Sequence, residues 1–169
     1  MNGEIFDMRE NLKNLTIREI KTEEYHLLED FLYEAIFIPK GAERPPKEII
    51  KEKQLQVYIK DFGKCNEDYC LIAEYNKKVI GACWTRIMND YGHIDYKTPS
   101  FAISLYEEYR GMGIGTKLMQ TMLEFLKSKG YHQASLSVQK KNYAVKMYEK
   151  VGFEITDEKE EEYIMLCKL

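Results

Sequence analysis

Residues 101–116 read FAISLYEEYRGMGIGT, and this stretch decides the fold. Its first part, 101–105, is short and apolar, which predicts a buried central strand. Residues 111–115 then alternate glycine with apolar residues, and a helix is predicted to begin within them. A strand, a glycine turn and a helix start aim several backbone N–H groups at one anion, and Arg110 adds a charge suited to phosphate oxygens. The stretch therefore predicts a phosphate-binding turn.

Two commoner phosphate-binding motifs do not fit this turn. A P-loop needs G-x-x-x-x-G-K-[ST]. Counting back from Gly115 puts Arg110 at the position of the first glycine, and Thr116-Lys117 has the reverse order of the required K-[ST] pair. The dinucleotide fingerprint G-x-G-x-x-G ends on Thr116 when it starts at Gly111, and on Leu118 when it starts at Gly113. A glycine turn that merely connects a strand to a helix stays open as the alternative.

The hydrophobic pattern elsewhere predicts one domain over residues 14–169, preceded by a polar extension over 1–13. Gly130 is a helix C-cap and Asn142 an N-cap. The order β-α-α-β-β-β-α-β-α-β-β predicts an α/β (α+β) fold, with a mixed sheet covered by helices on both faces. Strands are expected at 15–20, 70–73, 79–84, 101–105, 134–138, 153–156 and 163–167, and helices at 22–36, 47–60, 114–129 and 142–151, with a charged loop at 157–162.

The composition excludes several classes of protein. The chain has 169 residues, of which 44% are hydrophobic and 31% charged, as expected of one globular domain. A net charge of -3 gives no general attraction to nucleic acid or anionic lipid, and no apolar run approaches the length of a membrane span. The three histidines show no metal-ligand spacing, so no metal is expected.

The cysteines indicate the compartment. Four are present, none in a C-x-x-C pair, and residues 1–10 carry acids and lack an apolar signal core. We therefore expect reduced thiols and a cytoplasmic protein.

A second segment, residues 142–153, reads NYAVKMYEKVGF. Ala144 and Tyr148 are four apart, so they share a helix face on which a small residue leaves room beside a tyrosine. A phenol with a pKa of about 10 can donate a proton to a departing thiolate. The amide of Asn142 could reach a ligand as well as cap the helix. The alternative is that Tyr148 only packs against the core.

Together the two segments resemble the GNAT superfamily of acetyl-CoA-dependent N-acetyltransferases. R-G-x-G-x-G follows a buried strand, N-x-A-x-x-x-Y-x-K-x-G-F follows the next one, and the match covers about residues 101–153. The resemblance implies a mostly antiparallel sheet of six to seven strands, with acetyl-CoA held between two splayed strands. It also implies direct attack of a primary amine, from a small molecule or a peptide, on the thioester in a ternary complex.

Site residues follow from the resemblance. Ile103, Ser104 and Leu105 would contact the pantetheine arm and the thioester, and the Leu105 N–H would stabilise the developing oxyanion. Asn142 would bond the pantetheine beside Ala144, and Tyr148 would protonate the coenzyme A thiolate. The pyrophosphate would be held by the turn, namely by Arg110, Gly111, Met112, Gly113, Ile114, Gly115 and Thr116.

The acceptor side is less defined by the sequence. Trp84 and Arg86 are candidates to line a site for an aromatic or anionic acceptor, although Trp84 could equally cover the edge of the core. Glu43 and Arg44 are further candidates. Candidate bases are Asp95, Glu107, Glu108 and His93, each of which could equally be a solvated loop residue.

The identity of the amine cannot be derived from the sequence, nor can the oligomeric state. Homodimers are common in the superfamily, but no segment here marks an interface. A non-catalytic acyl-CoA sensor is the alternative function.

Overall fold

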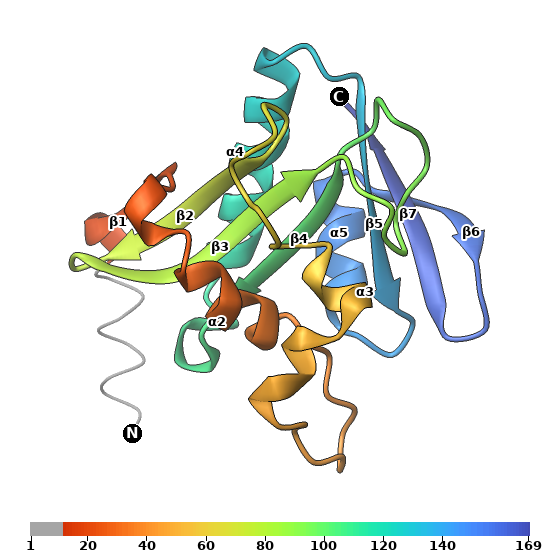
Figure 1. Cartoon of the computed structure of the whole chain (residues 1–169), viewed down its shortest axis with the longest axis horizontal. Helices are drawn as coiled ribbons and strands as arrows, with labels where there is room; N and C mark the ends of the chain where they lie inside the picture. Colours follow the sequence, from red (N-terminus) through yellow and green to blue (C-terminus); the bar gives the residue numbers. More distant parts are fainter. Residues whose placement is uncertain (1–11) are drawn as a thin grey trace.

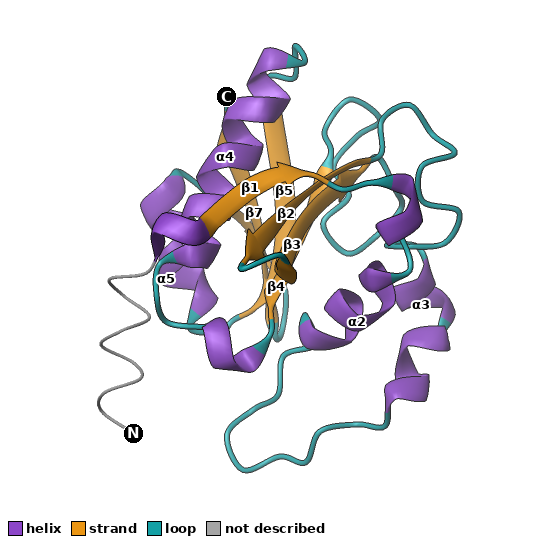
Figure 2. Ribbon diagram, turned by 90° about the vertical axis from the view of Figure 1, so that its left-hand side faces the viewer, coloured by secondary structure: helices purple, strands orange, loops and turns teal. Residues whose placement is uncertain are grey.

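A computed structural model describes residues 12–169 of the chain and shows one seven-stranded sheet with helices on both faces (Figures 1 and 2). The strand order is β1-β2-β3-β4-β5-β7-β6. Every neighbouring pair is antiparallel except β4 and β5, which run parallel. The predicted extension, residues 1–13, lies outside the described residues except for its last two.

The elements follow the predicted order. The strands are β1 (Leu15–Glu19), β2 (Tyr69–Tyr75), β3 (Lys78–Arg86), β4 (Ser100–Leu105), β5 (Gln133–Gln139), β6 (Glu154–Glu158) and β7 (Glu162–Lys168). The α-helices are α2 (Leu27–Glu34), α3 (Lys53–Gln56), α4 (Ile114–Ser128) and α5 (Ala144–Val151), and the 3-10 turns are η1 (Leu12–Asn14), η2 (Thr22–Glu24), η3 (Lys47–Lys51) and η4 (Glu107–Tyr109).

The alternation of side chains along the strands divides the core into two layers. One layer lies between the sheet and helices α4 and α5, where Leu136 and Met165 pack against Leu118 and Met122. The other lies beneath α2 and η3, where Phe31 and Ile50 pack on Ile72. Figure 2 shows the two sets of helices on opposite sides of the sheet. The central strands therefore present alternate residues to two different layers.

The single helix predicted over 47–60 is wrong, because the structure interrupts it at Glu52. Pro46 caps the short turn η3, the chain then extends at Glu52 with φ -61° and ψ 139°, and α3 follows. The Gln56 side-chain amide donates to the Ile50 carbonyl at 2.7 Å, so a side chain satisfies a backbone group at the break. The break lets Ile50 be buried under the sheet. The helix predicted from Thr22 is similarly split into η2 and α2.

The predicted loop over 157–162 is also shorter than expected. Strand β6 continues to Glu158, and β7 begins at Glu162, which pairs with Gln139 of β5. Glu162 is therefore a sheet residue with a defined side-chain direction.

Strands β4 and β5 separate along their length. Their register contains a single residue pair, Ser100 with Ser135, next to a hydrogen bond from the Ser135 N–H to the Pro99 carbonyl. The β3–β4 loop closes this end, because the Ser135 hydroxyl donates to the Gly92 carbonyl at 2.7 Å. Beyond this point the backbone groups of β4 that face β5 lie along an opening between the two strands.

Candidate active site at the strand splay

Two cavities meet at the splay. The larger, of about 710 Å³, is lined by the glycine turn, the start of α5 and residues of the α2–η3 loop. The smaller, of about 360 Å³, lies on the α2 face, between that loop, η3, α3 and the ends of β5 and β7. Ile103, Asn142 and Tyr148 line both cavities. One end of a ligand in the larger cavity would therefore lie next to a ligand bound in the smaller cavity.

The glycine turn has the backbone conformation that its glycines allow. Gly111 and Gly113 have φ of +74° and +82°, in the left-handed region, and a Cβ on either would meet nothing within 4 Å. Gly113 caps α4, whose Lys117 N–H donates to the Gly113 carbonyl. The N–H groups of the first turn therefore lack helical partners and border the larger cavity. Such a turn suits a phosphate group.

The two apolar residues of the turn face away from the cavity. Met112 and Ile114 pack with the core, whereas Gly115 and Thr116 line the cavity. Only the backbone of Met112 and Ile114 is available to a ligand.

The Arg110 side chain is committed elsewhere, which corrects the expectation that its charge is free for phosphate. Its guanidinium donates to the Leu105 carbonyl at 3.0 Å, and to the carbonyl and carboxylate of Glu34 at 3.1 and 2.8 Å. Arg110 thereby fastens the end of β4 to the end of α2. Lys40 and Lys141 supply further positive charge around the cavity, whereas Arg44 also lines it but pairs with the Glu34 carboxylate at 3.1 Å.

The end of β4 offers backbone groups to the splay. The Tyr106 N–H donates to the Ile80 carbonyl of β3, so by strand alternation the N–H groups of Leu105 and Ile103 point toward β5. This direction is the one that the predicted role of Leu105 requires. The Ser104 hydroxyl points to the α2 side instead, where it donates to the Phe31 carbonyl at 2.6 Å.

Helix α5 brings three predicted residues to the junction. The Asn142 side-chain oxygen accepts from the Ala144 N–H at 2.9 Å, so Asn142 satisfies the first N–H of α5 as predicted, although the N-cap position itself is Tyr143. Ala144 and Tyr148 both line the larger cavity, as their shared helix face requires. Burial raises the pKa of the Tyr148 phenol well above its usual value. The phenol therefore stays protonated at neutral pH, as a proton donor must.

Two predicted acceptor residues have structural roles. Trp84 is 0% exposed, and its indole N–H donates to the Tyr58 carbonyl at 3.0 Å. Arg86 pairs with Asp68 at 2.8 Å and donates to backbone carbonyls that follow α3. The expectation that they line the acceptor site is wrong because both side chains are consumed in joining α3 to the sheet.

The predicted bases are also elsewhere. Asp95 accepts from the Lys97 N–H at 2.7 Å. Neither Asp95 nor His93 lines either cavity. Glu108 pairs with Lys78 at 3.8 Å, whereas Glu107 lines the larger cavity. Of the two candidates in the Pro-rich loop, Arg44 lines the larger cavity and Glu43 lines neither.

The sequence reasoning missed the four titratable residues that line the smaller cavity, apart from the predicted Tyr148, namely Glu52, Tyr58, Tyr91 and Glu162. Glu162 could have been found by continuing the alternation of the predicted strand by one residue.

Solved structures share this architecture. The chain matches the PaiA N-acetyltransferase of Thermoplasma acidophilum, solved in complex with coenzyme A, with a TM-score of 0.67 over 92% of this chain and 99% of that one. The sequence identity is 22%, so the likeness concerns the fold. That fold is the one used by N-acetyltransferases.

The chain belongs to the Acetyltransferase (GNAT) family, whose sequence model matches residues 24–153. It is 29% identical over 148 residues to an uncharacterised N-acetyltransferase of Methanocaldococcus jannaschii, covering 85% of this chain and 62% of that protein. It is 28% identical over 100 residues to human N-acetyltransferase 8B, covering 59% and 42%. The matches thus span about half the length of these relatives.

Two features are absent from the described part of the chain. Within residues 12–169, no group of three or more His, Cys, Asp or Glu side chains is arranged to hold a metal ion. None of the helices in that range is both long and apolar enough to cross a membrane.

Proposed function

We propose that this protein transfers the acetyl group of acetyl-CoA to a primary amine by direct attack in a ternary complex. The observation that carries the proposal is the position of Tyr148, where a cavity bordered by the glycine turn meets a second cavity on the α2 face of the sheet. One cavity suits the donor and the other the acceptor, so the two substrates would meet beside a proton donor. The family membership and the coenzyme A complex of a structural relative support the choice of donor.

In this proposal the chain supplies positioning and proton transfer. The N–H groups of residues 111–116 hold the pyrophosphate, and the opening between β4 and β5 receives the pantetheine arm. The Leu105 N–H, directed into the splay, would bond the thioester carbonyl oxygen as negative charge develops on it. Tyr148 would give its proton to the sulfur as the C–S bond breaks.

The phenylalanine variant of Tyr148 tests the proton donor. Tyr148→Phe should keep its affinity for coenzyme A and lose about 100-fold in kcat, because only the departing thiolate uses the hydroxyl. Thiol release from acetyl-CoA across a panel of amines measures turnover, and calorimetry measures coenzyme A binding.

The pH profile gives the same test independently. Because burial raises the Tyr148 pKa, the acid form persists on the alkaline side, and kcat should not fall as the pH rises to about 10. An alkaline loss of activity near neutral pH in the wild type, or full activity in Tyr148→Phe, would contradict this role.

The alternative is a non-catalytic acyl-CoA sensor. Coenzyme A binding by the wild type with no turnover of any amine would favour it. No binding of coenzyme A would remove both functions.

Two narrower expectations remain proposals. The four cysteines are free thiols, which supports a reducing compartment such as the cytoplasm. A homodimer, as is common in the family, remains a prediction for sedimentation analysis.

A further inference from the structure

The two cavities carry opposite charge. Among the described residues, four cations and two acids line the larger one, namely Lys40, Arg44, Arg110 and Lys141 against Glu34 and Glu107. The charged residues that line the smaller one are both acids, Glu52 and Glu162. A basic cavity suits the phosphates of a nucleotide donor, and an acidic one suits a cation. The separation of charge therefore matches a donor anion and an acceptor ammonium.

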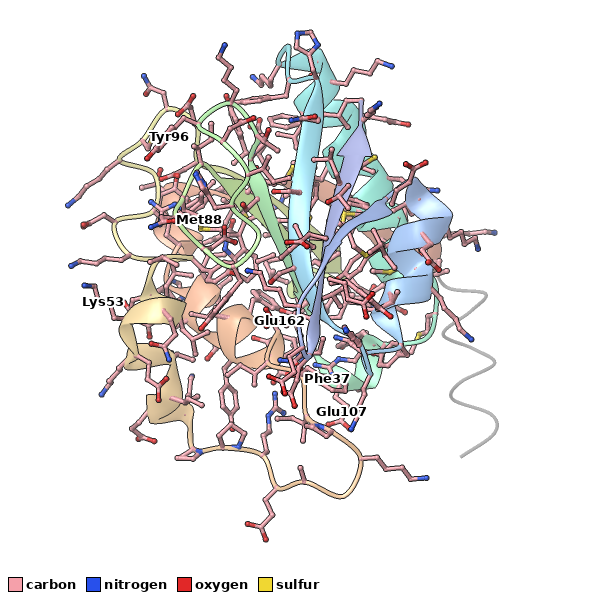
Figure 3. The ribbon with its side chains drawn as sticks, turned by 90° about the vertical axis from the view of Figure 1, so that its right-hand side faces the viewer. Phe37, Lys53, Met88, Tyr96, Glu107 and Glu162 are labelled. Carbon is pink, nitrogen blue, oxygen red and sulfur yellow. The ribbon has the colours of Figure 1, made fainter. Side chains whose placement is uncertain are left out.

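Glu162 has the geometry of a ligand-binding carboxylate. It is the first residue of β7. The next residue, Tyr163, and Met165 both pack in the core layer on the α4–α5 side of the sheet. Because side chains alternate along a strand, Glu162 points to the other side, toward the α2 face. Figure 3 shows it at that end of the sheet, above Phe37, and both residues line the smaller cavity. Within residues 12–169 its carboxylate has no ion-pair partner. Its charge is therefore available to a ligand.

The rest of the smaller cavity is mostly apolar. Leu32, Phe37, Ile49 and Leu55 line it together with the rings of Tyr58 and Tyr91. A volume of about 360 Å³ is near the lower end of the range for small-molecule sites. Glu52, an exposed residue, extends the negative charge to the wall formed by η3 and α3. The lining suits a compact apolar group attached to one ammonium.

We propose that Glu162 binds the ammonium of the acceptor and takes its proton, and that the acceptor is a primary amine with an apolar body and no carboxylate beside the nitrogen. The inference rests on the proposed acetyltransferase function and specifies its acceptor half. Glu162 lies one strand away from the splay, next to Gln139, on the face where the acceptor must enter. Phe37, Leu55 and Tyr91 would hold the apolar body.

The proton balance is closed by named groups. The ammonium first gives a proton to the Glu162 carboxylate, directly or through one water, leaving a neutral amine and a carboxylic acid. The nitrogen lone pair then forms the C–N bond and the C–S bond breaks. Tyr148 gives its proton to the departing sulfur. The nitrogen then loses its second proton, which returns through solvent to the Tyr148 phenolate. The first proton leaves Glu162 for solvent, so each cycle yields an amide, a thiol and one released proton.

The test compares two single-charge variants of one hairpin. Glu162→Gln keeps the size of the side chain and removes the base, whereas Glu160→Gln removes an exposed carboxylate two residues away. We expect Glu162→Gln to lose about 100-fold in kcat/KM for the amine while KM for acetyl-CoA is unchanged. Glu160→Gln should behave as the wild type. A defect of less than threefold in Glu162→Gln would overturn the inference.

The pH dependence separates a base from a structural residue. At alkaline pH the amine is already deprotonated in solution and does not need the Glu162 carboxylate as a base. The ratio of wild-type to Glu162→Gln activity should therefore shrink as the pH rises. A defect of equal size at every pH would contradict a role in proton transfer.

A matched pair of amines tests the substrate class. Phenylalanine differs from 2-phenylethylamine mainly by a carboxylate beside the amine, which Glu162 would repel. The wild type should prefer 2-phenylethylamine at least tenfold, and Glu162→Gln should narrow that preference. Equal use of the two would overturn the inference while leaving the acetyltransferase intact. Coenzyme A binding without turnover of any amine would instead remove the proposed function, and this inference with it.

Discussion

At the scale of single residues, the donor site depends on backbone angles that only glycine adopts easily. Gly113 and Gly130 both have positive φ, +82° and +89°, and a Cβ on either meets nothing within 4 Å. Gly113 borders the larger cavity, whereas Gly130 follows the distant end of α4. The two positions therefore have similar backbone conformations, in which any other residue would be strained, and they differ in their distance from the proposed ligand.

Alanine at each position separates strain from binding. Each variant should lose about 1–2 kcal/mol of folding stability, because alanine is strained in the left-handed region. Only Gly113→Ala should weaken coenzyme A binding, by at least tenfold, since its methyl group would occupy the anion's place. Urea unfolding and calorimetry measure the two effects. Equal coenzyme A affinity in the two variants would show that the phosphates bind elsewhere.

Residue types were predicted better than residue partners. The capping hydrogen bond of Asn142 follows from neighbouring residues, and the structure contains it, with the N-cap position one residue later at Tyr143. The pairing of Arg110 with Glu34 joins positions 76 apart, so no local pattern could indicate it. For the same reason the lone Trp84 gave no sign of its hydrogen bond to Tyr58. A charged or aromatic side chain is available to a substrate only if it does not already form a hydrogen bond or ion pair with a residue distant in the sequence.

At the scale of elements, the β3–β4 loop holds the closed end of the splay. A Cβ on Gly92 would lie 3.0 Å from the Leu136 carbonyl carbon and the Ser137 nitrogen, so any other residue would require one of the two backbone segments to shift. Asp90 accepts from the Ser100 hydroxyl at 2.9 Å, and Tyr91, the residue between Asp90 and Gly92, lines the smaller cavity. The loop thus fixes the wall that Tyr91 provides.

Gly92→Ala should displace this wall. We expect a loss of about 1–3 kcal/mol in stability, because the methyl group meets backbone that cannot turn aside. In steady-state kinetics, kcat/KM for the amine should fall while KM for acetyl-CoA holds. A variant with unchanged amine kinetics would show that the loop plays no part in the acceptor site.

Elements were predicted well where periodicity was strong and poorly where packing overrode it. The strands and α4 follow directly from their alternating or helical patterns. The segment 47–60 has a helical pattern, but burial of Ile50 breaks it at Glu52. At the last hairpin, pairing with β5 extends β7 back to Glu162. That extension is the reason why a presumed loop residue faces a cavity.

At the scale of the whole molecule, we propose that two adjoining cavities of opposite charge receive the two substrates, which would meet at the opening that Ile103, Asn142 and Tyr148 line. The donor half was predictable because a contiguous motif, residues 110–116, forms its core. The acceptor half is assembled from α2, η3, α3, the β3–β4 loop and β7, which come together only in the fold. Its acids, Glu52 and Glu162, are 110 residues apart in the chain.

The central claim is that coenzyme A lies in the splay with its sulfur at Tyr148. A crystal structure of the coenzyme A complex tests it most directly. We expect the pyrophosphate on the N–H groups of residues 111–116 and the sulfur within hydrogen-bonding distance of the Tyr148 oxygen. A pyrophosphate bound away from the glycine turn, or a sulfur directed away from Tyr148, would contradict the account.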